Sequence, residues 1–494
     1  MLRKIRISLA AIFFICITLL FLDFTGTVHA WIGWMAKIQF LPAVLALNVG
    51  VVIFLVALTL LLGRIYCSVI CPLGVMQDII SWYGGKRKKN RFEYSAEKRW
   101  LRYGVLAVFI ALMLLGFGSI ALLVAPYSAF GRIAHSLLAP IWAFGNNILA
   151  FIAESIDSYA FYSTDIVIGS WATFVVAVVT LVVVGILAWR NGRTYCNTIC
   201  PVGTVLGFLS KFSLFKPVID TTKCIDCGLC AKKCKASCID AKNHQIDYSR
   251  CVVCMDCLES CKKDAISYTM RRGANVAKQT QSEEKVDNSR KNFLVGAGLL
   301  AASAAKAQEM KLDGGYAEII KKEPRAKFRT LTPAGSMSAR NMASHCTGCQ
   351  LCVSVCPNDV LRPSPHLENF MQPAMSYENG YCRPECVKCS EVCPTGAIKP
   401  ISIVEKSSIQ IGHAVWVKRN CVVITDDVDC GNCAEHCPTG AISMVLSDYN
   451  NKRSRKIPVI NKERCIGCGA CEHLCPSRPF SAIYVKSYKE HHTI

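Results

Sequence analysis

Acidic residues and histidines are both scarce in this chain. Asp and Glu number 35 against 56 Lys and Arg, which gives a formal net charge of +21 over 494 residues. A basic excess is common in nucleic-acid-binding proteins, but no groove-reading motif accompanies it here, so we expect no nucleic-acid partner. The 10 histidines never fall as a pair within the long apolar stretches, which excludes a haem b held by two helices inside a membrane.

Cysteine, by contrast, is abundant, with 30 residues in a chain that is 52% hydrophobic. Most of the cysteines fall in six runs that follow the spacing C-x2-C-x2-C-x3-C or a variant of it. This is iron–sulfur spacing rather than the pattern of a secreted disulfide scaffold. Six [4Fe–4S] clusters with thiolate ligands would remove about 12 units of the positive charge, since each carries about −2. At this length we expect two to four domains.

Four apolar stretches early in the chain predict transmembrane helices, at residues 7–22, 40–62, 103–124 and 171–189. Each is near the length that a hydrocarbon core of about 30 Å requires, and we interpret the first as a retained helix rather than a signal peptide. Twelve basic residues lie before the first span or between the second and third, against two, Lys37 and Arg132, on the other side. The positive-inside rule therefore places the amino terminus in the cytoplasm.

The loop at residues 125–165 is apolar in its middle and predicts one or two helices at the outer interface. Four ionisable residues on that side could accept protons in a quinol pocket, although polar groups at a wet interface are the simpler interpretation. They are His29, His135, Glu154 and Asp157.

An internal repeat follows the second and fourth predicted spans. Residues 63–74 read GRIYCSVICPLG, and residues 192–203 read GRTYCNTICPVG. The copies share their glycines, an arginine, a tyrosine and a C-x3-C-P motif, and each should lie at the cytoplasmic surface of the membrane. Their cysteines could hold one further cluster about a pseudo-twofold axis, form a redox-active dithiol pair or bind another metal. These cysteines are Cys67, Cys71, Cys196 and Cys200.

Residues 211–270 contain two regular runs and predict a small two-cluster ferredoxin. In this fold the fourth cysteine of each run ligates the other cluster. One cluster is therefore expected on Cys224, Cys227, Cys230 and Cys261, and the second on Cys251, Cys254, Cys257 and Cys234. Cys238 is left over, and we interpret it as structural.

Residues 271–288 read as a polar linker, and residues 289–307 resemble a twin-arginine export signal or a fifth span. We favour a crossing here, which leaves residues 308–494 in the periplasm; a cytoplasmic linker helix is the alternative.

That last domain carries four cysteine runs, of which the middle two are irregular. We expect nested exchange of the fourth ligands, first run with fourth and second with third, although sequential exchange uses the same sixteen ligands. They are Cys346, Cys349, Cys352, Cys356, Cys382, Cys386, Cys389, Cys393, Cys421, Cys430, Cys433, Cys437, Cys465, Cys468, Cys471 and Cys475.

On these motifs the chain resembles two families. Residues 1 to about 270, with four spans, two C-x3-C-P motifs and a two-cluster ferredoxin, resemble the NapH family of membrane ferredoxin-type proteins, related to NosR, MauN and CcoG. Residues from about 289 onward resemble the NapG/MauM family of exported ferredoxin-type proteins, so the chain looks like a fusion of the two. The resemblance implies quinol dehydrogenation. The membrane part would take electrons from menaquinol or ubiquinol, and the ferredoxin modules would pass them to a terminal reductase such as periplasmic nitrate reductase.

The sequence thus predicts a multi-domain, multi-pass protein of the bacterial cytoplasmic (inner) membrane. An α-helical membrane domain of four transmembrane helices, at residues 1–210, is joined to α+β bacterial ferredoxin-like domains, and residues 289–307 are the candidate for a fifth helix. We expect six [4Fe–4S] clusters, or seven with the repeat cysteines. The expected partners are membrane lipid, the quinone pool and a redox protein, either a terminal reductase or its electron-transfer subunit.

We expect an electron-transfer component of a quinol dehydrogenase rather than a free-standing catalyst, because no acid–base group or open coordination site stands out at a cluster. The alternative is a redox factor for assembly or metal handling in the maturation of another metalloenzyme. A redox sensor would need an output domain, and the sequence shows none.

Overall fold

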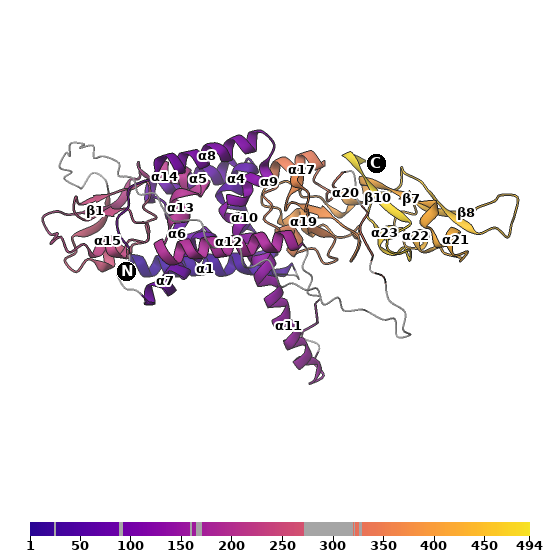
Figure 1. Cartoon of the computed structure of the whole chain (residues 1–494), viewed down its shortest axis with the longest axis horizontal. Helices are drawn as coiled ribbons and strands as arrows, with labels where there is room; N and C mark the ends of the chain where they lie inside the picture. Colours follow the sequence, from indigo (N-terminus) through magenta and orange to yellow (C-terminus); the bar gives the residue numbers. More distant parts are fainter. Residues whose placement is uncertain are drawn as a thin grey trace, which may run out of the picture.

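The structure is a computed structural model of the whole chain, and it describes residues 1–23, 26–87, 92–158, 161–164, 170–270, 320, 322–325 and 329–494. The predicted linker at 271–288 and the apolar segment at 289–307 lie outside the described residues. A helical domain forms the middle of an elongated molecule, with one ferredoxin-like module at each end (Figure 1).

The helical domain is built from helices of very different lengths around the two repeats. Its elements are α1 (Leu2–Leu22), α2 (Thr27–Ile32), α3 (Trp34–Lys37), α4 (Phe40–Leu45), α5 (Val49–Leu62), α6 (Ile65–Val69), α7 (Pro72–Arg87), α8 (Arg99–Leu114), α9 (Gly118–Ala121), the 3-10 turn η1 (Leu122–Val124), α10 (Pro126–Ile133), the π-helical turn η2 (Ala134–Leu138), α11 (Ala139–Glu154), α12 (Trp171–Asn191), α13 (Thr194–Thr198) and α14 (Pro201–Ser210).

Within the part of the chain that the structure describes, three continuous helical stretches are long and apolar enough to cross a membrane: Leu2–Leu22, Pro126–Glu154 and Trp171–Asn191. The first and third correspond to predicted spans. The predicted span at 40–62 is instead broken between α4 and α5, where Leu47 has a φ of 52° and the side chain of Asn48 caps α5. The predicted span at 103–124 is broken at Gly116, with a φ of 84°. Apolar composition alone therefore overestimated the length of two helices.

Helix α12 shows how these helices face lipid. Its inward positions are small or β-branched and buried, namely Thr173, Ala177, Val184 and Ala188. Its outward positions are larger and half exposed, with Val175 and Val179 at 54% and Ile186 at 53%. Small residues inside and large apolar residues outside are the packing pattern of membrane helices.

The long stretch from Pro126 bends at the π-helical turn. Helix α10 packs inside the bundle against α7 and α12, whereas α11 leaves the bundle sideways, close to the end that carries the C-terminal module (Figure 1). The prediction of helices at the outer interface was therefore wrong for α10, which is buried in the bundle, and the whole stretch Pro126–Glu154 is itself long and apolar enough to cross a membrane.

The amino-terminal ferredoxin module contains two short helices and two antiparallel strand pairs. Strand β1 pairs with β4, with Phe215 opposite Met270, and β2 pairs with β3. Its elements are β1 (Phe215–Ile219), α15 (Leu229–Lys233), β2 (Ile239–Asp240), β3 (Gln245–Ile246), α16 (Asp256–Ser260) and β4 (Ile266–Met270).

The C-terminal module has three further strand pairs, β5 with β6, β7 with β10 and β8 with β9, all antiparallel. Its elements are α17 (Ala339–His345), α18 (Leu351–Ser354), β5 (Leu361–Pro363), η4 (Leu367–Asn369), β6 (Pro373–Met375), α19 (Lys388–Val392), α20 (Ile403–Ser408), β7 (Ile409–Trp416), η5 (Lys418–Asn420), α21 (Val422–Thr425), α22 (Asn432–Glu435), β8 (Ile442–Leu446), β9 (Lys456–Ile460), α23 (Ala470–His473) and β10 (Ile483–Thr493).

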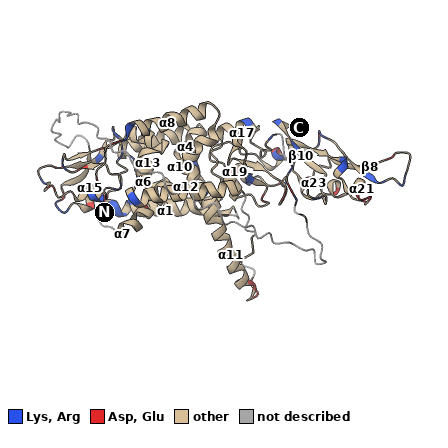
Figure 2. Ribbon diagram, viewed as in Figure 1, with Lys and Arg blue, Asp and Glu red and all other residues tan. Residues whose placement is uncertain are grey.

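Helix α1 reaches from one module to the other. At its start, Arg3 pairs with Asp256 at 2.7 Å and with Glu259 in the amino-terminal module. At its end it packs against α18 of the C-terminal module. Twenty-one residues of helix extend about 30 Å, the thickness of a bilayer core. Between the modules the bundle is almost free of Lys, Arg, Asp and Glu at its surface (Figure 2).

Candidate functional site: seven groups of four cysteines

All 30 cysteines lie in described segments, and none forms a disulfide. In the amino-terminal module, one cavity is lined by the thiols of Cys224, Cys227, Cys230 and Cys261, which we call group A. A second is lined by Cys238 and by four cysteines of the runs, Cys234, Cys251, Cys254 and Cys257, which we call group B. Each group takes its fourth cysteine from the other run, so the predicted exchange is the arrangement that the structure shows.

The C-terminal module contains four more groups. Group D is formed by Cys346, Cys349, Cys352 and Cys393, which interact electrostatically with one another. The other three groups line cavities. They are group E (Cys356, Cys382, Cys386 and Cys389), group F (Cys437, Cys465, Cys468 and Cys471) and group G (Cys421, Cys430, Cys433 and Cys475).

The expectation of nested exchange was therefore wrong. The first run exchanges its fourth cysteine with the second, and the third with the fourth. Each run pairs with its neighbour because the chain returns at once through short strands, so the two halves of each unit fold on local contacts. The irregular spacing of the two middle runs is absorbed in loops and does not make them partners.

The surroundings of these thiols fit a cationic cluster core. Burial, together with the neighbouring thiols, raises the pKa of Cys433 to about 12, because thiolates crowded together would repel one another. An iron–sulfur core removes that repulsion. Backbone N–H groups also point at the sulfur atoms, for example from Ala441 to Cys437 at 3.2 Å and from Ala265 to Cys261 at 3.3 Å. Such hydrogen bonds are the usual way a protein sets cluster potential.

The four repeat cysteines form a seventh group, group C, inside the helical domain. Cys67, Cys71, Cys196 and Cys200 are each at most 5% exposed. Cys71 interacts electrostatically with Cys67 and Cys196, and Cys200 interacts with all three others. The two C-x3-C-P motifs thus bring their thiols to one place, as a shared site requires.

The arginine of each repeat reaches across to the other copy. Arg193 donates to the carbonyl of Cys67 at 2.7 Å, and Arg64 donates to the carbonyl of Cys196 at 3.2 Å. Each guanidinium also lies 3.8 Å from the sulfur of the first cysteine of its own repeat. This exchange is the pseudo-twofold symmetry that the duplication predicted.

The last glycine of each repeat has a steric role. A Cβ on Gly74 would collide with the carbonyl of Cys67 and lie 2.6 Å from Arg193, and a Cβ on Gly203 would collide with the carbonyl of Cys196 and lie 2.9 Å from Arg64. The N–H of Gly203 donates to the sulfur of Cys200 at 3.3 Å. The proline after each motif begins α7 or α14, so both helix N-termini favour negative charge at group C.

Buried positive charge around group C exceeds buried negative charge. Arg64 is fully buried and donates to Asn197 at 2.9 Å and to the carbonyl of Ser249 at 3.0 Å, and among the described residues it pairs with no acid. Around the site five buried or nearly buried cations face three acids, an excess of two. They are Arg6, Arg64, Arg102, Arg193 and Lys235 against Asp78, Glu97 and Asp256. A [4Fe–4S] cluster with four thiolates carries about −2, so its charge is opposite in sign to this excess.

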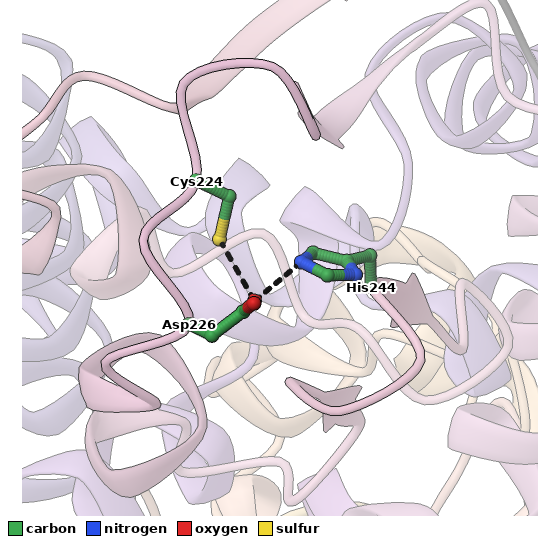
Figure 3. A group of neighbouring side chains, drawn as sticks. All are labelled: Cys224, Asp226 and His244. Atoms are coloured by element: carbon green, nitrogen blue, oxygen red, sulfur yellow. Dashed lines mark hydrogen bonds and ion pairs between the residues drawn. The ribbon is translucent and has the colours of Figure 1, made fainter.

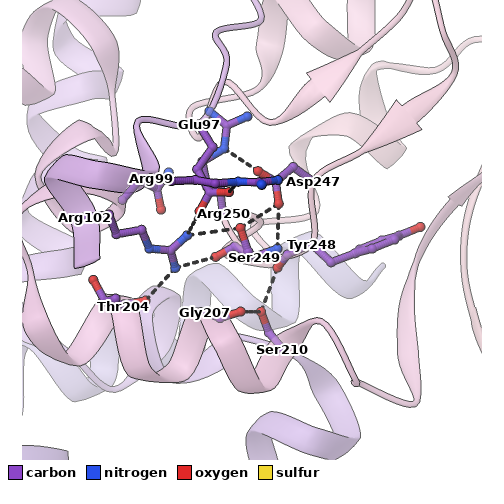
Figure 4. Close-up of polar contacts among 12 residues, drawn as sticks. Glu97, Arg99, Arg102, Thr204, Gly207, Ser210, Asp247, Tyr248, Ser249 and Arg250 are labelled. Atoms are coloured by element: carbon purple, nitrogen blue, oxygen red, sulfur yellow. Dashed lines mark hydrogen bonds and ion pairs between the residues drawn. The ribbon is translucent and has the colours of Figure 1, made fainter. Parts of the chain in front are cut away.

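Three buried arginines, Arg64, Arg102 and Arg193, bond to the amino-terminal ferredoxin module, and we call them the arginine cradle. Figure 4 shows the contacts of Arg102. Arg102 of α8 donates to the side chain of Ser249 at 3.1 Å and to its carbonyl at 3.0 Å. Glu97 forms a salt bridge with Arg102 at 2.8 Å. On the other side, the N–H of Arg193 donates to the carbonyl of Lys235 at 2.9 Å, and Lys235 follows the group B ligand Cys234. Groups B and C therefore lie on the two sides of one polar interface.

Side chains also connect group C with group D. The hydroxyl of Tyr195, beside Cys196, donates to the carbonyl of Val124 at 2.7 Å. Arg132, 1% exposed, interacts electrostatically with both Tyr195 and Cys349 of group D. Gly131 packs directly on the carbonyl of Cys349, leaving no room for a Cβ.

Groups E and F meet within the C-terminal module. The N–H of Cys382 in group E donates to the carbonyl of Cys468 in group F at 3.0 Å. Tyr377 lies beside both groups, and its hydroxyl donates to the carbonyl of Gly467 at 2.6 Å. The seven groups thus follow one another in the order A, B, C, D, E, F, G from one end of the molecule to the other.

Two further features surround the amino-terminal groups. Cys224, Asp226 and His244 bring ligand atoms within 4.8 Å of one another (Figure 3), with His244 Nε2 2.6 Å from the carboxylate of Asp226. Because Cys224 belongs to group A, this trio is a polar edge of that group rather than a separate metal site. Cys238 is 2% exposed and its sulfur lies 3.5 Å from that of Cys234, so the leftover cysteine packs against group B.

No hydrogen bond or ion pair among the described residues joins any two of the four ionisable residues considered for a quinol pocket. His29 pairs with Asp23 at 3.1 Å near the end of α1. His135 lies in the π-helical turn, Glu154 ends α11 and Asp157 follows it. Sequence reasoning missed the arginine cradle and Asp78. The arginine shared by both repeats was the signal that could have found it.

Comparisons with known proteins agree with this arrangement. A family model described as a 4Fe-4S binding domain matches residues 44–90 and 171–219, the two repeats with their preceding helices. A 4Fe-4S dicluster domain matches residues 345–397 and 428–478, the two sequential units of the C-terminal module. Another dicluster model matches residues 247–360, which joins runs that the structure places at opposite ends of the helical domain. No solved structure shows a significant match.

Several relatives share about a third of the chain. The methylamine utilization ferredoxin-type protein MauM of Methylobacillus flagellatus is 28% identical over 32% of this chain and 68% of its own length. The ferredoxin-type protein NapG of Escherichia coli is 28% identical over 31% of the chain and 68% of its own length. The ferredoxin-type protein NapH of Haemophilus influenzae is 28% identical over 39% of the chain and 55% of its own length.

A NapH/MauM-like polyferredoxin fits these matches. The resemblance drawn from the motifs is thereby confirmed, and the chain contains several [4Fe–4S] ferredoxin domains and apolar membrane-type helices. The NapH-like and MauM-like features occur in one polypeptide, with the helical domain between the two ferredoxin modules.

Proposed function

We propose that this protein is a membrane-bound electron-transfer component of a quinol dehydrogenase, in which seven [4Fe–4S] clusters form one row across the bilayer. Groups A, B, D, E, F and G hold six clusters, and group C holds the seventh. Each cluster supplies one-electron chemistry. The chain's own residues fix the thiols, balance the charge and exclude water. Electrons from the quinol pool leave through the C-terminal module to a terminal reductase, such as a periplasmic nitrate reductase, or to its electron-transfer subunit.

The observation that carries this proposal is the position of group C. Arg6, on the second turn of α1, donates to the carbonyl of Ser68 at 3.4 Å, so group C lies beside the first third of that helix. Phe21, on its last turn, packs where Gly131 meets Cys349 of group D. Arg6 and Phe21 are about 22 Å apart along the helix. A cluster at group C therefore divides a barrier of about 30 Å into shorter steps, which no other described group does.

Orientation follows from the charge pattern. The amino terminus, α6 and α13 of the two repeats and the amino-terminal ferredoxin module lie at one end of the bundle (Figure 1), and the basic residues Arg3, Lys4 and Arg6 precede the first span there. The positive-inside rule makes this end cytoplasmic and the C-terminal module periplasmic. The proposal includes the predicted crossing at residues 289–307, which lie outside the described residues.

Reduction by a quinol tests the proposal. The full-length protein is purified and reconstituted anaerobically, its iron is counted, and the clusters are followed by electron paramagnetic resonance as menadiol is added. The proposal expects about 28 iron atoms per chain and cluster signals that grow with menadiol. If dithionite reduces the clusters and menadiol does not, the quinol-dehydrogenase function is wrong, and a role in assembly or metal handling becomes the better interpretation.

A further inference from the structure

A tight turn after α1 fixes a histidine beside the C-terminal module. Asp23 accepts hydrogen bonds from the N–H groups of Gly26 at 2.9 Å and Val28 at 2.8 Å. Its carboxylate also lies 3.1 Å from Nδ1 of His29. Both side chains are almost fully buried, with Asp23 at 3% and His29 at 6% exposed. The turn therefore holds the imidazole ring in one orientation.

The other nitrogen of this ring is left without a partner. Because Nδ1 faces a carboxylate, it carries the proton, and Nε2 presents a lone pair. Nε2 is buried and accepts no hydrogen bond from the described residues. An unsatisfied buried acceptor is costly, so the site is suited to a hydroxyl donor.

A cation and two cluster groups adjoin the ring. Lys388 acts electrostatically on His29, and its ammonium lies over Gly26, 3.5 Å from where a Cβ would stand. Lys388 stands between Cys386 and Cys389 of group E. The end of α1 packs on α18, which carries Cys352 of group D. A reductant at Nε2 would therefore have one-electron acceptors next to it.

The surface outside the turn suits a lipid-borne molecule. Trp31 and Trp34, on α2 and α3, are 84% and 53% exposed. Exposed tryptophans at the end of a transmembrane helix mark the membrane interface. An apolar tail can lie along them in the bilayer while its polar head reaches His29.

We propose that the head group of a quinol binds here, with one hydroxyl donating to Nε2 of His29 and with Lys388 facing the oxygen that loses its proton. This inference rests on the proposed function and gives it a site. Oxidation breaks both O–H bonds of the quinol and yields the quinone. Two electrons would pass one at a time to groups D and E, part-way along the row, with groups F and G leading to the reductase and group C leading to the amino-terminal module; one proton would go to His29 Nε2 and the other to water on the same side.

The charge state of the ring suits a proton acceptor. Burial lowers the pKa of His29 below its ordinary value of 6.5, and Lys388 acts in the same direction while Asp23 opposes both. Among the described residues, Asp23 and Lys388 are the charged groups that act on the ring. A neutral ring at pH 7 can take a proton, and the rate of quinol oxidation should fall only when the pH drops below 6.5, as the ring becomes charged.

The test compares His29→Gln with the control His366→Gln, an exposed histidine of the C-terminal module. Three quantities are measured on the full chain: iron content, binding of the fluorescent quinol analogue 2-heptyl-4-hydroxyquinoline N-oxide, and the rate of cluster reduction by menadiol. His29→Gln should keep its iron, bind the analogue at least tenfold more weakly and reduce its clusters about 100-fold more slowly. The control should match the wild type in all three.

The outcomes separate this site from the proposed function. If His29→Gln binds the analogue and is reduced like the wild type, the site is wrong while the function stands. If the wild type is itself not reduced by menadiol, the function fails. If His29→Gln loses iron, the variant cannot test the site, and the wild type is instead labelled with a photoreactive azidoquinone to locate the binding residues. Labelling of residues 26–35 or 383–393 supports the site, and labelling confined to other segments overturns it.

Discussion

Four residues after the first repeat, Asp78 faces three cations: Arg193 at 2.9 Å, Arg6 at 3.0 Å and Lys235 at 3.5 Å. At the matching position after the second repeat stands Gly207, where a Cβ would collide with the guanidinium of Arg102. The cysteines, arginines, prolines and final glycines are the same in both copies. Residues that the copies share therefore build the cysteine site, with Arg64 and Arg193 also bonding to the ferredoxin module, and the residues that differ add a separate contact on each side.

The comparison explains why the ferredoxin module sits on one side of a symmetric pair. Asp78 holds Lys235, which follows Cys234, while the space above Gly207 lets Arg102 reach Ser249. Two different contacts at equivalent positions orient a single module over a pseudo-twofold axis. A symmetric pair of aspartates or glycines would not select one orientation.

The largest expected effect comes from Asp78→Asn. This change leaves three buried cations without their shared acid, and removing one partner of a buried ion pair costs about 3–5 kcal/mol. We expect a lower unfolding temperature and loss of the signals of group B as the ferredoxin module detaches. Thermal unfolding in detergent and paramagnetic resonance measure both. Glu97→Gln, which removes the one acid facing Arg102, should have a smaller effect; an equal effect would contradict the special role of Asp78.

Next in size is Gly203→Ala, which places a Cβ against Cys196 and Arg64. Overpacking of this kind costs about 1–3 kcal/mol, and here it also displaces a carbonyl that orients the cysteine site. We expect the variant to lose about four iron atoms from group C and to keep those of the ferredoxin modules. Gly85→Ala, at a position with open space around it, is the matched control and should lose no iron.

Arg64→Gln tests the charge balance directly. Removing this cation should lower the potential of the group C cluster, by on the order of 60 mV for a tenfold change in its reduction equilibrium. It should also stabilise the iron-free protein, because an uncompensated buried charge is gone. A redox titration and an unfolding curve of the iron-free form check the two results. An unchanged reduction potential would mean that the charge of Arg64 does not act on the group C cluster.

The smallest effect is expected for Arg3→Ala. Arg3 is 37% exposed and pairs with Asp256 and Glu259 at the end of α1. Pairs this exposed contribute at most about 1 kcal/mol and are screened by salt. We expect a small fall in unfolding temperature at low ionic strength that disappears at high salt. A fall in unfolding temperature as large as that of Asp78→Asn would mean that the exposed ion pairs of Arg3 hold the module in place, rather than the buried contacts at the repeats.

The sequence predicted the parts of this architecture that depend on spacing. Cysteine runs define their own ligand groups, and the duplication predicted that Cys67 and Cys196 meet. The sequence could not predict the helix breaks at Leu47 and Gly116, because apolar composition carries no information on where the backbone changes direction. Nested exchange failed for a related reason: irregular spacing in a run says how long its loop is and not which run lies beside it.

The sequence also did not predict the arginine cradle that Arg64, Arg102 and Arg193 form. Arginines near membrane spans ordinarily count toward the positive-inside rule, where they are expected to be solvent-facing. Here three of them are at most 1% exposed. Only their contacts across the repeats show that they face the cysteine site.

The most direct test of the account is the iron content of Cys67→Ser/Cys196→Ser against the wild type. Both proteins are reconstituted side by side, and the ferredoxin signals are recorded to show that the modules remain loaded. The account predicts about 28 iron atoms per chain in the wild type and about 24 in the variant. Equal iron in the two proteins, at about 24 atoms, would contradict it, because the repeat cysteines would then hold no cluster and the row across the membrane would be broken.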